Sequence, residues 1–286
     1  MSHLQYIAKS HHLQWSMPQI TKFCRTLYRN YCPDSIKHRR NIKLAKVFDE
    51  SILVLLVIQA ELGITSQRYF YKICRLISCG TLLERSRFNR RARQLIWIFQ
   101  LIRQAMNGQI PSETVVIMDS FPLPLCQTIR NHRTIFKEIA DIGYNASKNM
   151  WFYGFKVHML VTLSGYIINY VVTPASVHDI KAVQELLEGC KHSVILADLG
   201  YLSKELKEEL AERGYKLWTP VRRNMKGAKQ WNDSKIAALR RTIETRFSKL
   251  CRKSNVEHTL SRGLTGLQLR IEQIVLSYNL DYFEIN

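Results

Sequence analysis

The sequence has no long apolar stretch and no paired cysteine motif. Its strongest apolar run, Ile52 to Ile58, is far shorter than the ~20 residues that a membrane-spanning helix needs. Residues 1–15 are polar and lack the apolar core of a secretory signal. The seven cysteines are scattered, with no Cys-x-x-Cys pair, so a zinc module is not expected. We therefore expect a protein with no membrane span and with free buried thiols in a reducing cytoplasm.

Acidic residues are scarce as well. There are 23 Asp and Glu against 42 Lys and Arg in 286 residues, a formal net charge of +19. A protein with that excess is usually held near a polyanion. Apolar residues make up 46%, enough for a real core, so disorder is not expected. The composition indicates a folded protein with a nucleic-acid partner; the alternatives are a ribosome-associated protein or a merely basic soluble one.

Residues 1–108 have the pattern of helices. Asp49 is a candidate N-cap for an apolar helix that Gly63 closes. The apolar side chains of residues 87–106 recur at three- and four-residue steps, as one face of a helix should. We predict that this all-helical region binds DNA and could include a helix-turn-helix. The basic start of its last helix supplies the candidate phosphate contacts Arg87, Arg90, Arg91 and Arg93.

The pattern changes in residues 109–286. Short β-branched runs alternate there with amphipathic stretches, which predicts an α/β domain with a mixed five-stranded sheet and helices. The expected strands are residues 115–119, 151–163, 165–172, 193–198 and 216–221. The expected helices are residues 179–190, residues 203–213 and a last helix carrying Ile236 to Leu250.

Two aspartates occupy matching positions at the ends of expected strands. Asp119 ends the run Val-Val-Ile-Met, and Asp198 ends Val-Ile-Leu-Ala. A carboxylate there loses hydration unless a partner offsets the cost, and open α/β sheets bind their ligands beyond the strand ends. Either residue alone is typical of a turn cap, but the matched pair favours a shared site. Mg²⁺ prefers such oxygen ligands, and two ions about 3.5–4 Å apart can clamp the oxygens of a phosphoryl transfer.

A third carboxylate would complete the site of the second ion. Glu244 is the candidate, because it lies beside the apolar stripe of Ile243 and Phe247 on the last expected helix. Periodicity alone favours the alternative, in which Glu244 is solvated and pairs with Arg240 four residues earlier.

Other polar residues leave two interpretations open. His158 and His178 are candidate ligands or bases, and a histidine satisfied within a strand or turn is an equal alternative. Asp179 could simply be a helix N-cap. A basic run between Asp198 and Glu244 is either a solvated loop or, as we favour, a set of phosphate contacts. Its members are Arg222, Arg223, Lys226 and Lys229.

Seven short motifs follow one another along the chain. They are Asp119-Ser-Phe-Pro-Leu-Pro, Gly154-Phe-Lys-Val-His158, Gly165-Tyr-Ile, Thr173-Pro-Ala-Ser-Val-His-Asp179, Leu196-Ala-Asp-Leu-Gly-Tyr201, Thr219-Pro-Val-Arg-Arg-Asn-Met-Lys226 and Ile243-Glu-Thr-Arg-Phe247. Together they resemble bacterial insertion-sequence transposases of the DDE class, most closely the insertion sequence nine-eight-two family. The resemblance covers roughly residues 36–286.

The resemblance implies a fold, a catalytic set and a cofactor. The fold is an RNase H-like catalytic domain over residues 109–286, preceded by the helical region 1–108. The catalytic carboxylates are Asp119, Asp198 and Glu244, which would bind two Mg²⁺ or Mn²⁺ ions per active site.

Relatives also carry a signature of Tyr, two residues, Arg, three residues, Glu, six residues, Lys. Arg240 and Glu244 match it, and Arg240 is thereby a further candidate DNA contact. Ala237 and Cys251 stand at the Tyr and Lys positions, so the chain departs from the signature there.

The implied protein is a transposase that binds the terminal inverted repeats of its element. It would cleave the DNA end and join the released 3′-OH to target DNA. Its expected partners are double-stranded element ends and target DNA, with a homodimer or higher oligomer on DNA, in the bacterial cytoplasm with the nucleoid. Two alternatives stay open: an RNase H-like nuclease that cuts without joining, and a catalytically dead, DNA-binding element product.

Overall fold

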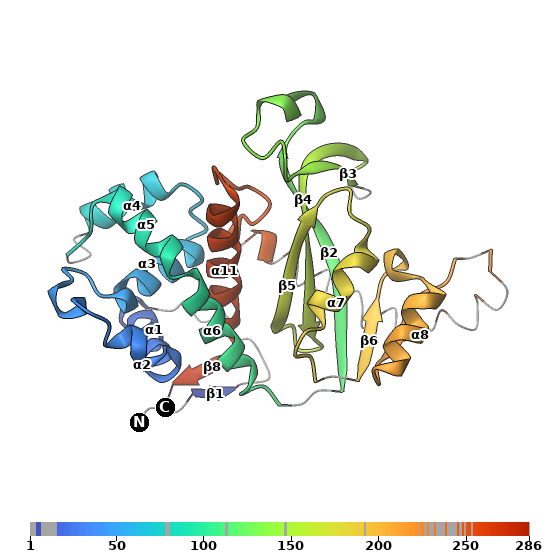
Figure 1. Ribbon diagram of the computed structural model, residues 1–286, viewed down its shortest axis with the longest axis horizontal. Helices are drawn as coiled ribbons and strands as arrows, with labels where there is room; N and C mark the ends of the chain where they lie inside the picture. The colour runs from blue at the N-terminus through green and yellow to red at the C-terminus, as the bar shows by residue number, and fades with distance from the viewer. Residues whose placement is uncertain are drawn as a thin grey trace. The chain divides into compact units, whose positions relative to one another are not determined.

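The computed structural model describes residues 4–6, 16–77, 81–111, 114–145, 148–191, 193–222 and 254–285, and between 223 and 253 only residues 224, 225, 228, 232, 238, 245, 248 and 250–252. The chain divides into two compact units (Figure 1). The first comprises Met1–Ile110 and Leu250–Asn286, and the second comprises Pro111–Lys249. In the part of the chain that the structure describes, no helix combines the length and the apolar character needed to span a bilayer.

The first unit is mainly helical. Its core helix α3 (Asp49–Glu61) is buried on every side from Ile52 to Ala60, and α1, α5 and α11 pack against it. The described helices are α1 (Met17–Tyr31), α2 (Asp34–Lys37), the 3-10 helix η1 (Ile42–Leu44), α3, α4 (Gln67–Leu76), α5 (Arg85–Gln94), α6 (Ile96–Asn107) and α11 (Leu264–Leu280). Strands β1 (Leu4–Tyr6) and β8 (Phe283–Ile285) pair antiparallel in the same unit.

Local chemistry explains where these helices begin. Ser16 and Gln19 form a reciprocal capping box at α1, and the Glu84 carboxylate accepts from the first N–H groups of α5. The sequence predicted one helix over residues 87–106, but the chain breaks at Leu95, which ends α5 and precedes α6. The periodicity of apolar residues continues through this kink, so it does not reveal the break.

The C-terminal helix α11 was not foreseen. It packs on α3 and α6, and the buried pair of Arg103 Nε and Glu272 Oε1, 2.9 Å apart, joins it to α6. The sequence-based division assigned everything after residue 108 to the catalytic domain, whereas Leu250–Asn286 belong to the first compact unit. A helix buried on nearly all sides has no amphipathic stripe by which to recognise it.

The second unit is built on a mixed sheet. Its strands are β2 (Val115–Cys126), β3 (Asp141–Asn145), β4 (Met150–Thr162), β5 (Ile167–Pro174), β6 (Val194–Ala197) and β7 (Lys216–Trp218). They lie in the order β3-β4-β2-β6-β7, with β5 also paired to β4. The pairs β2–β4, β3–β4 and β4–β5 are antiparallel, and β2–β6 and β6–β7 are parallel.

Short helices connect and cover these strands. They are the 3-10 helices η2 (Thr128–Arg133), η3 (Asp179–Ala182) and η4 (Leu199–Tyr201), and the α-helices α7 (Val183–Leu186) and α8 (Lys204–Glu212). Helix α7 packs on β4 and β5 (Figure 1), and α8 packs on β7. The helix expected over 179–190 is therefore η3 followed by α7, and the last expected helix, from Ile236 to Leu250, lies largely outside the described residues.

Two expectations about the sheet need correction. It has six described strands rather than five, because Asp141-Ile-Gly-Tyr-Asn145, rich in turn-forming residues, pairs with β4 as β3. Strand β2 also runs past Asp119 to Cys126, although it contains Pro122 and Pro124. Prolines lack an N–H, and they fit here because the pairing with β6 stops at Met118 and leaves that side of β2 without a ladder to β6.

Candidate active site

The register of β2 and β6 brings two of the predicted carboxylates together. Met118 lies opposite Ala197 at the last position of this parallel pairing; Asp119 is the next residue on β2, and Asp198 is the first residue after β6. Asp198 keeps an extended backbone, with φ −81° and ψ 173°. Neighbouring strands lie about 4.8 Å apart, and residues opposite one another point to the same face of a sheet. Asp119 and Asp198 are therefore neighbours on one face, where β6 ends.

Each of these carboxylates is oriented by the backbone that follows it. Asp119 Oδ1 accepts from the N–H of Ser120 at 2.8 Å, and Asp198 Oδ1 accepts from the N–H of Leu199 at 2.6 Å. Both residues are half-buried. Asp198 thus caps η4, as the turn-cap interpretation expected, while it also lies beside Asp119. The two roles are compatible, because the cap uses one oxygen and fixes the direction of the carboxylate.

A buried polar network underlies the pair on the opposite face of the sheet. Ser120, one residue after Asp119, lies opposite His158 of β4. The two ring nitrogens of His158 contact Tyr201 and Thr173: Nδ1 lies 3.3 Å from the Tyr201 hydroxyl and Nε2 lies 2.9 Å from Thr173 Oγ1. His158 and Tyr201 are fully inaccessible to solvent. The network joins β4, β5 and the η4 turn directly after Asp198.

The electrostatics keep this network neutral. Burial lowers the pKa of His158 from 6.5 to about 4; Asp179 opposes that shift and Lys156 adds to it. Burial raises the pKa of Tyr201 well above its usual value, and the negative charges of Asp179, Asp119 and Asp198 raise it further. Near neutral pH the imidazole is uncharged and the phenol keeps its proton. The negative charges of all three aspartates act on the Tyr201 hydroxyl, so this side chain is electrostatically coupled to the Asp119–Asp198 pair.

Asp179 supports the turn that carries Asp198. Its Oδ1 accepts from Lys156 Nζ at 2.6 Å, and its Oδ2 lies where a Cβ on Gly200 would come within 2.7 Å. A larger residue at position 200 would force either that carboxylate or the backbone of η4 to shift. The N-cap of η3 is His178, whose Nδ1 accepts from Ile180, so Asp179 is not the cap that the sequence suggested. Both histidines have the structural roles that the sequence left open as alternatives: His158 is hydrogen-bonded within strand β4, and His178 caps the turn at η3.

The sequence missed the positions of Lys156 and Tyr201 in this arrangement. Both lie inside motifs that the sequence analysis quoted, Gly154–His158 and Leu196–Tyr201, but neither was singled out. The Lys156 side chain meets Asp179 of η3, and the Tyr201 side chain of η4 meets His158, through long-range packing of 3-10 helices against β4, which no local pattern encodes. The signal that could have found them is the presence of polar residues within runs that otherwise pattern as buried strand.

The remaining predicted site residues are scattered or lie outside the described part of the chain. Glu244, Arg240, Arg223 and Lys226 are outside the described residues. Arg222 is described and is exposed after β7. On α5, Arg87, Arg90 and Arg93 are exposed and Arg91 is half-buried. Among the described side chains no cluster of three or more His, Cys, Asp or Glu is arranged to hold a metal ion. Whether Glu244 joins the two aspartates therefore stays a prediction.

The family of the chain follows from a match to a known domain. The family model described as "Transposase DDE domain" matches residues 109–264, which is more than half of the chain. The chain therefore belongs to this family, and the expectation of a DDE transposase is confirmed. Membership makes the protein a transposase and implies, in general terms, nuclease or transferase activity that depends on divalent metal ions.

Comparison with solved structures finds a distant likeness. A cryo-EM structure of a piggyBac transposase synaptic complex with hairpin DNA is similar at 14% sequence identity, with a TM-score of 0.48. The similarity covers 91% of this chain and 75% of that one. Comparison with curated proteins found no match.

Proposed function

We propose that this transposase binds the terminal inverted repeats of an insertion sequence, cleaves the DNA at the element end and transfers the released 3′-OH to target DNA. The reaction would take place in an RNase H-like catalytic domain. The observation that carries the proposal is the β2–β6 register, which sets Asp119 beside Asp198 within the segment matched by the DDE domain. The mixed sheet and the order of its strands support the choice of fold.

The donor set suits hard divalent cations. Two adjacent, half-buried carboxylates offer the oxygen ligands that Mg²⁺ and Mn²⁺ prefer, and Glu244 is the proposed third ligand. Two such ions, when bound, would activate a water or a 3′-OH and stabilise the charge that develops on the phosphate. Asp119 and Asp198 contribute by holding their oxygens in fixed directions through their backbone N–H bonds. Tyr201 and His158 contribute by keeping the strand and turn behind them in place.

DNA binding would come from the cationic surfaces. The arginines of α5, Arg87 to Arg93, and the run Arg222, Arg223 and Lys226 are the proposed phosphate contacts, together with Arg240. Within the described residues, α3 and α4 are the best candidate for a helix-turn-helix. They are joined by a short turn in which Gly63 has φ 61°. Helix α4 exposes Arg68, Lys72 and Arg75 for base or backbone contacts.

The finer classification rests on the sequence motifs. We propose that the protein belongs to the insertion sequence nine-eight-two group, acts in the bacterial cytoplasm with the nucleoid, and assembles as a homodimer or higher oligomer on DNA. Two other readings of the same site remain: a nuclease that cuts without joining, and a DNA-binding element product with a dead site. They differ from the proposal in the reaction products, not in the fold.

A strand-transfer assay separates these three functions. Labelled duplexes made from the DNA that flanks the gene would be incubated with the protein, a supercoiled target and Mg²⁺, Mn²⁺, Ca²⁺ or EDTA. The proposal expects cleaved ends and joined products in Mg²⁺ and Mn²⁺, and neither in EDTA. Cleavage without joining would favour the nuclease, and binding without cleavage would favour the dead product. Products that form equally well in EDTA would exclude the metal-dependent mechanism.

A further inference from the structure

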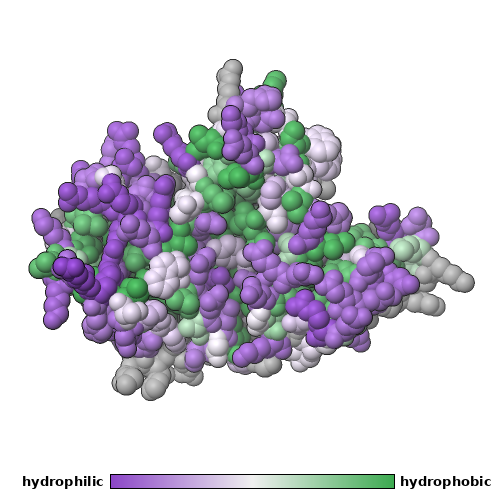
Figure 2. Space-filling model, viewed as in Figure 1, coloured by the Kyte–Doolittle hydropathy of each residue, from purple (hydrophilic) through white to green (hydrophobic). Residues whose placement is uncertain are grey.

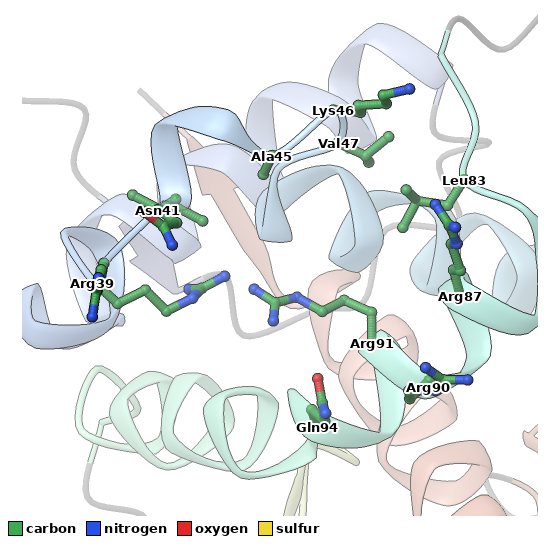
Figure 3. A pocket seen from close by; sticks show the side chains of 12 residues that line it. Arg39, Asn41, Ala45, Lys46, Val47, Leu83, Arg87, Arg90, Arg91 and Gln94 are labelled. Carbon is green, nitrogen blue, oxygen red and sulfur yellow. The ribbon is translucent and has the colours of Figure 1, made fainter.

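A basic hollow lies beside helix α5 in the first unit. It has a volume of about 360 Å³ and is formed by the segment between α2 and α3 together with one side of α5 (Figure 3). Among the described side chains that line it, six are cationic and none is acidic. The cationic residues are Arg39, Arg40, Lys46, Arg87, Arg90 and Arg91. Like charges in one hollow repel each other, so an anionic occupant would lower the energy of this surface.

Two of these arginines are held in place by hydrogen bonds to one buried carboxylate. Asp49 Oδ1 accepts from Nε and Nη2 of Arg91 at 2.9 and 2.6 Å, and its Oδ2 accepts from Arg39 Nη1 at 2.6 Å. The Asp49 side chain is only 1% exposed. Arg39 and Arg91 reach the hollow from opposite walls (Figure 3). Because their guanidinium groups are already ordered, less side-chain entropy is lost when they bind an anion.

A second basic hollow continues from the first across α5. It has a volume of about 560 Å³, and Arg90 and Gln94 line both hollows. Arg85 and Arg93 add two further cations to its lining. Phe88 and Ala92 are fully buried and anchor the other face of α5. Hydrophilic side chains crowd the surface of this part of the first unit (Figure 2).

We propose that the two hollows form one track for the phosphodiester backbone of DNA. The track consists of Arg39, Arg40, Lys46, Arg85, Arg87, Arg90, Arg91 and Arg93. This inference rests on the proposed function, because it names the surface by which that transposase holds its DNA. It adds Arg85 at the start of α5, and also Arg39, Arg40 and Lys46, which the sequence did not single out because they lie in a segment with little regular structure between α2 and α3.

A polyanion fits this surface better than a single small anion. A helix of ten residues is about 15 Å long, a length that corresponds to roughly four phosphates per strand when measured along the duplex axis. Guanidinium groups bind phosphate oxygens bidentately, and seven of the eight cations are arginines. A contact with the backbone carries no base information, so the track binds any duplex sequence.

The test compares two matched double variants of the full chain. Lys46→Gln/Arg87→Gln removes two exposed cations from the track, and Lys22→Gln/Arg29→Gln removes two exposed cations from a separate hollow at α1. Binding of a fluorescent duplex of arbitrary sequence is measured by anisotropy at several salt concentrations. The plot of log K against log salt should lose about 2 from its slope in the track variant, since each phosphate contact contributes about 0.9. The α1 variant should keep the wild-type slope.

Three results would overturn the track. The two variants could lower the slope equally, which would make net charge the only cause. The track variant could keep the full slope. Inorganic phosphate, exchanged for chloride at constant ionic strength, could displace the duplex strongly from the wild type and not from the track variant, which would indicate a small-anion pocket.

If the slopes change as expected but no DNA is cleaved or joined, the proposed function fails and the track stands. If wild-type protein cleaves and joins but the track variant binds normally, only the track fails.

Discussion

Asp49 in the first unit and the Asp119–Asp198 pair in the second are held by opposite means. Asp49 is almost completely buried and accepts bonds from two arginines and from the Tyr28 hydroxyl. Asp119 and Asp198 are half-buried, and each accepts from the backbone N–H of the following residue. A carboxylate enclosed by cations is committed to structure, whereas a half-buried carboxylate at the end of a strand keeps the solvent access that a metal ion would need.

The two units are expected to have different tasks, with DNA binding in the first and the chemical reaction in the second. The cations of the first unit surround one buried carboxylate and form the proposed surface for DNA phosphates, where affinity should depend on the number of charges. The carboxylates of the second unit depend on their mutual position, which the β2–β6 register sets. Removing a charge should therefore change affinity in one unit and rate in the other.

The largest expected effect is on catalysis. Asp119→Ala or Asp198→Ala should lower strand transfer by roughly 10³-fold or more, because a metal site supplies several kcal/mol of transition-state stabilisation. End binding should stay within about threefold of wild type, since affinity comes mainly from Lys and Arg. Gel shifts and strand-transfer rates on the same preparations measure the two effects.

Asp141→Ala is the matched control for that experiment. Asp141 also accepts from the N–H of the residue that follows it, at 2.7 Å, but it lies exposed on β3. It should retain both activities. If an Asp119 or Asp198 variant joined DNA at near the wild-type rate, the carboxylate pair would not be the catalytic site.

The second effect is on stability. Asp49→Ala should lower the free energy of unfolding by about 3 kcal/mol, because it leaves Arg39 and Arg91 facing each other without their shared counter-charge. We place it at the low end of the range for broken buried pairs, since both arginines are partly exposed. Urea unfolding measures it, with Asp34→Ala, an exposed helical aspartate, as control. Equal stability of the two variants would refute the structural role of Asp49.

Much of the second unit could be predicted from the sequence, because its strands are marked by local patterns. The β-branched runs before Asp119 and Asp198 and the hairpin at Ser164-Gly165 identified β4, β5 and β6 within a few residues, and the start of β2 but not its end at Cys126. The adjacency of the two aspartates followed from their matching positions. The third member, Glu244, lies outside the described residues, so its place in the site is still an inference from motifs.

Long-range pairing explains what the sequence did not reveal. A charged residue such as Glu272 argues against a core helix when the sequence is taken alone, yet this fully buried side chain is paired with Arg103, 169 positions away in the chain. Likewise Arg39 and Arg91 meet only because both reach Asp49. Local periodicity carries no information about such partners, so the buried helix α11 and the basic hollow both escaped prediction.

The third effect tests how the turn after Asp198 is held. Gly200→Ala would bring a Cβ within 2.7 Å of Asp179 Oδ2, which Lys156 holds in place on its other oxygen. The turn should shift, and strand transfer should fall roughly 10- to 100-fold, because displacements of about 1 Å at a reacting centre cost up to about 10². DNA affinity should not change. Gly263→Ala, where a Cβ meets open space, is the control. Activity within twofold of wild type would mean that Asp179 does not fix the turn.

The smallest expected effect concerns pH and the neutral network beneath the carboxylates. His158 has a folded pKa of about 4 against 6.5 for a free histidine, so the folded protein binds fewer protons than the unfolded chain in that interval. The contribution of neutral His158 to the free energy of unfolding is therefore fully present above about pH 6.5, and it is lost as the pH drops towards 4. The contribution of this one group should fall by about 2 kcal/mol between pH 7 and pH 5.

Urea unfolding of the wild type and of His158→Gln at both pH values measures this contribution. The loss of unfolding free energy on acidification should be about 2 kcal/mol smaller in the variant than in the wild type. His132→Gln, which changes an exposed histidine, should behave as wild type. An identical pH dependence in wild type and His158→Gln would mean that His158 titrates normally, and that the sheet behind Asp119 and Asp198 is not held by a buried neutral imidazole.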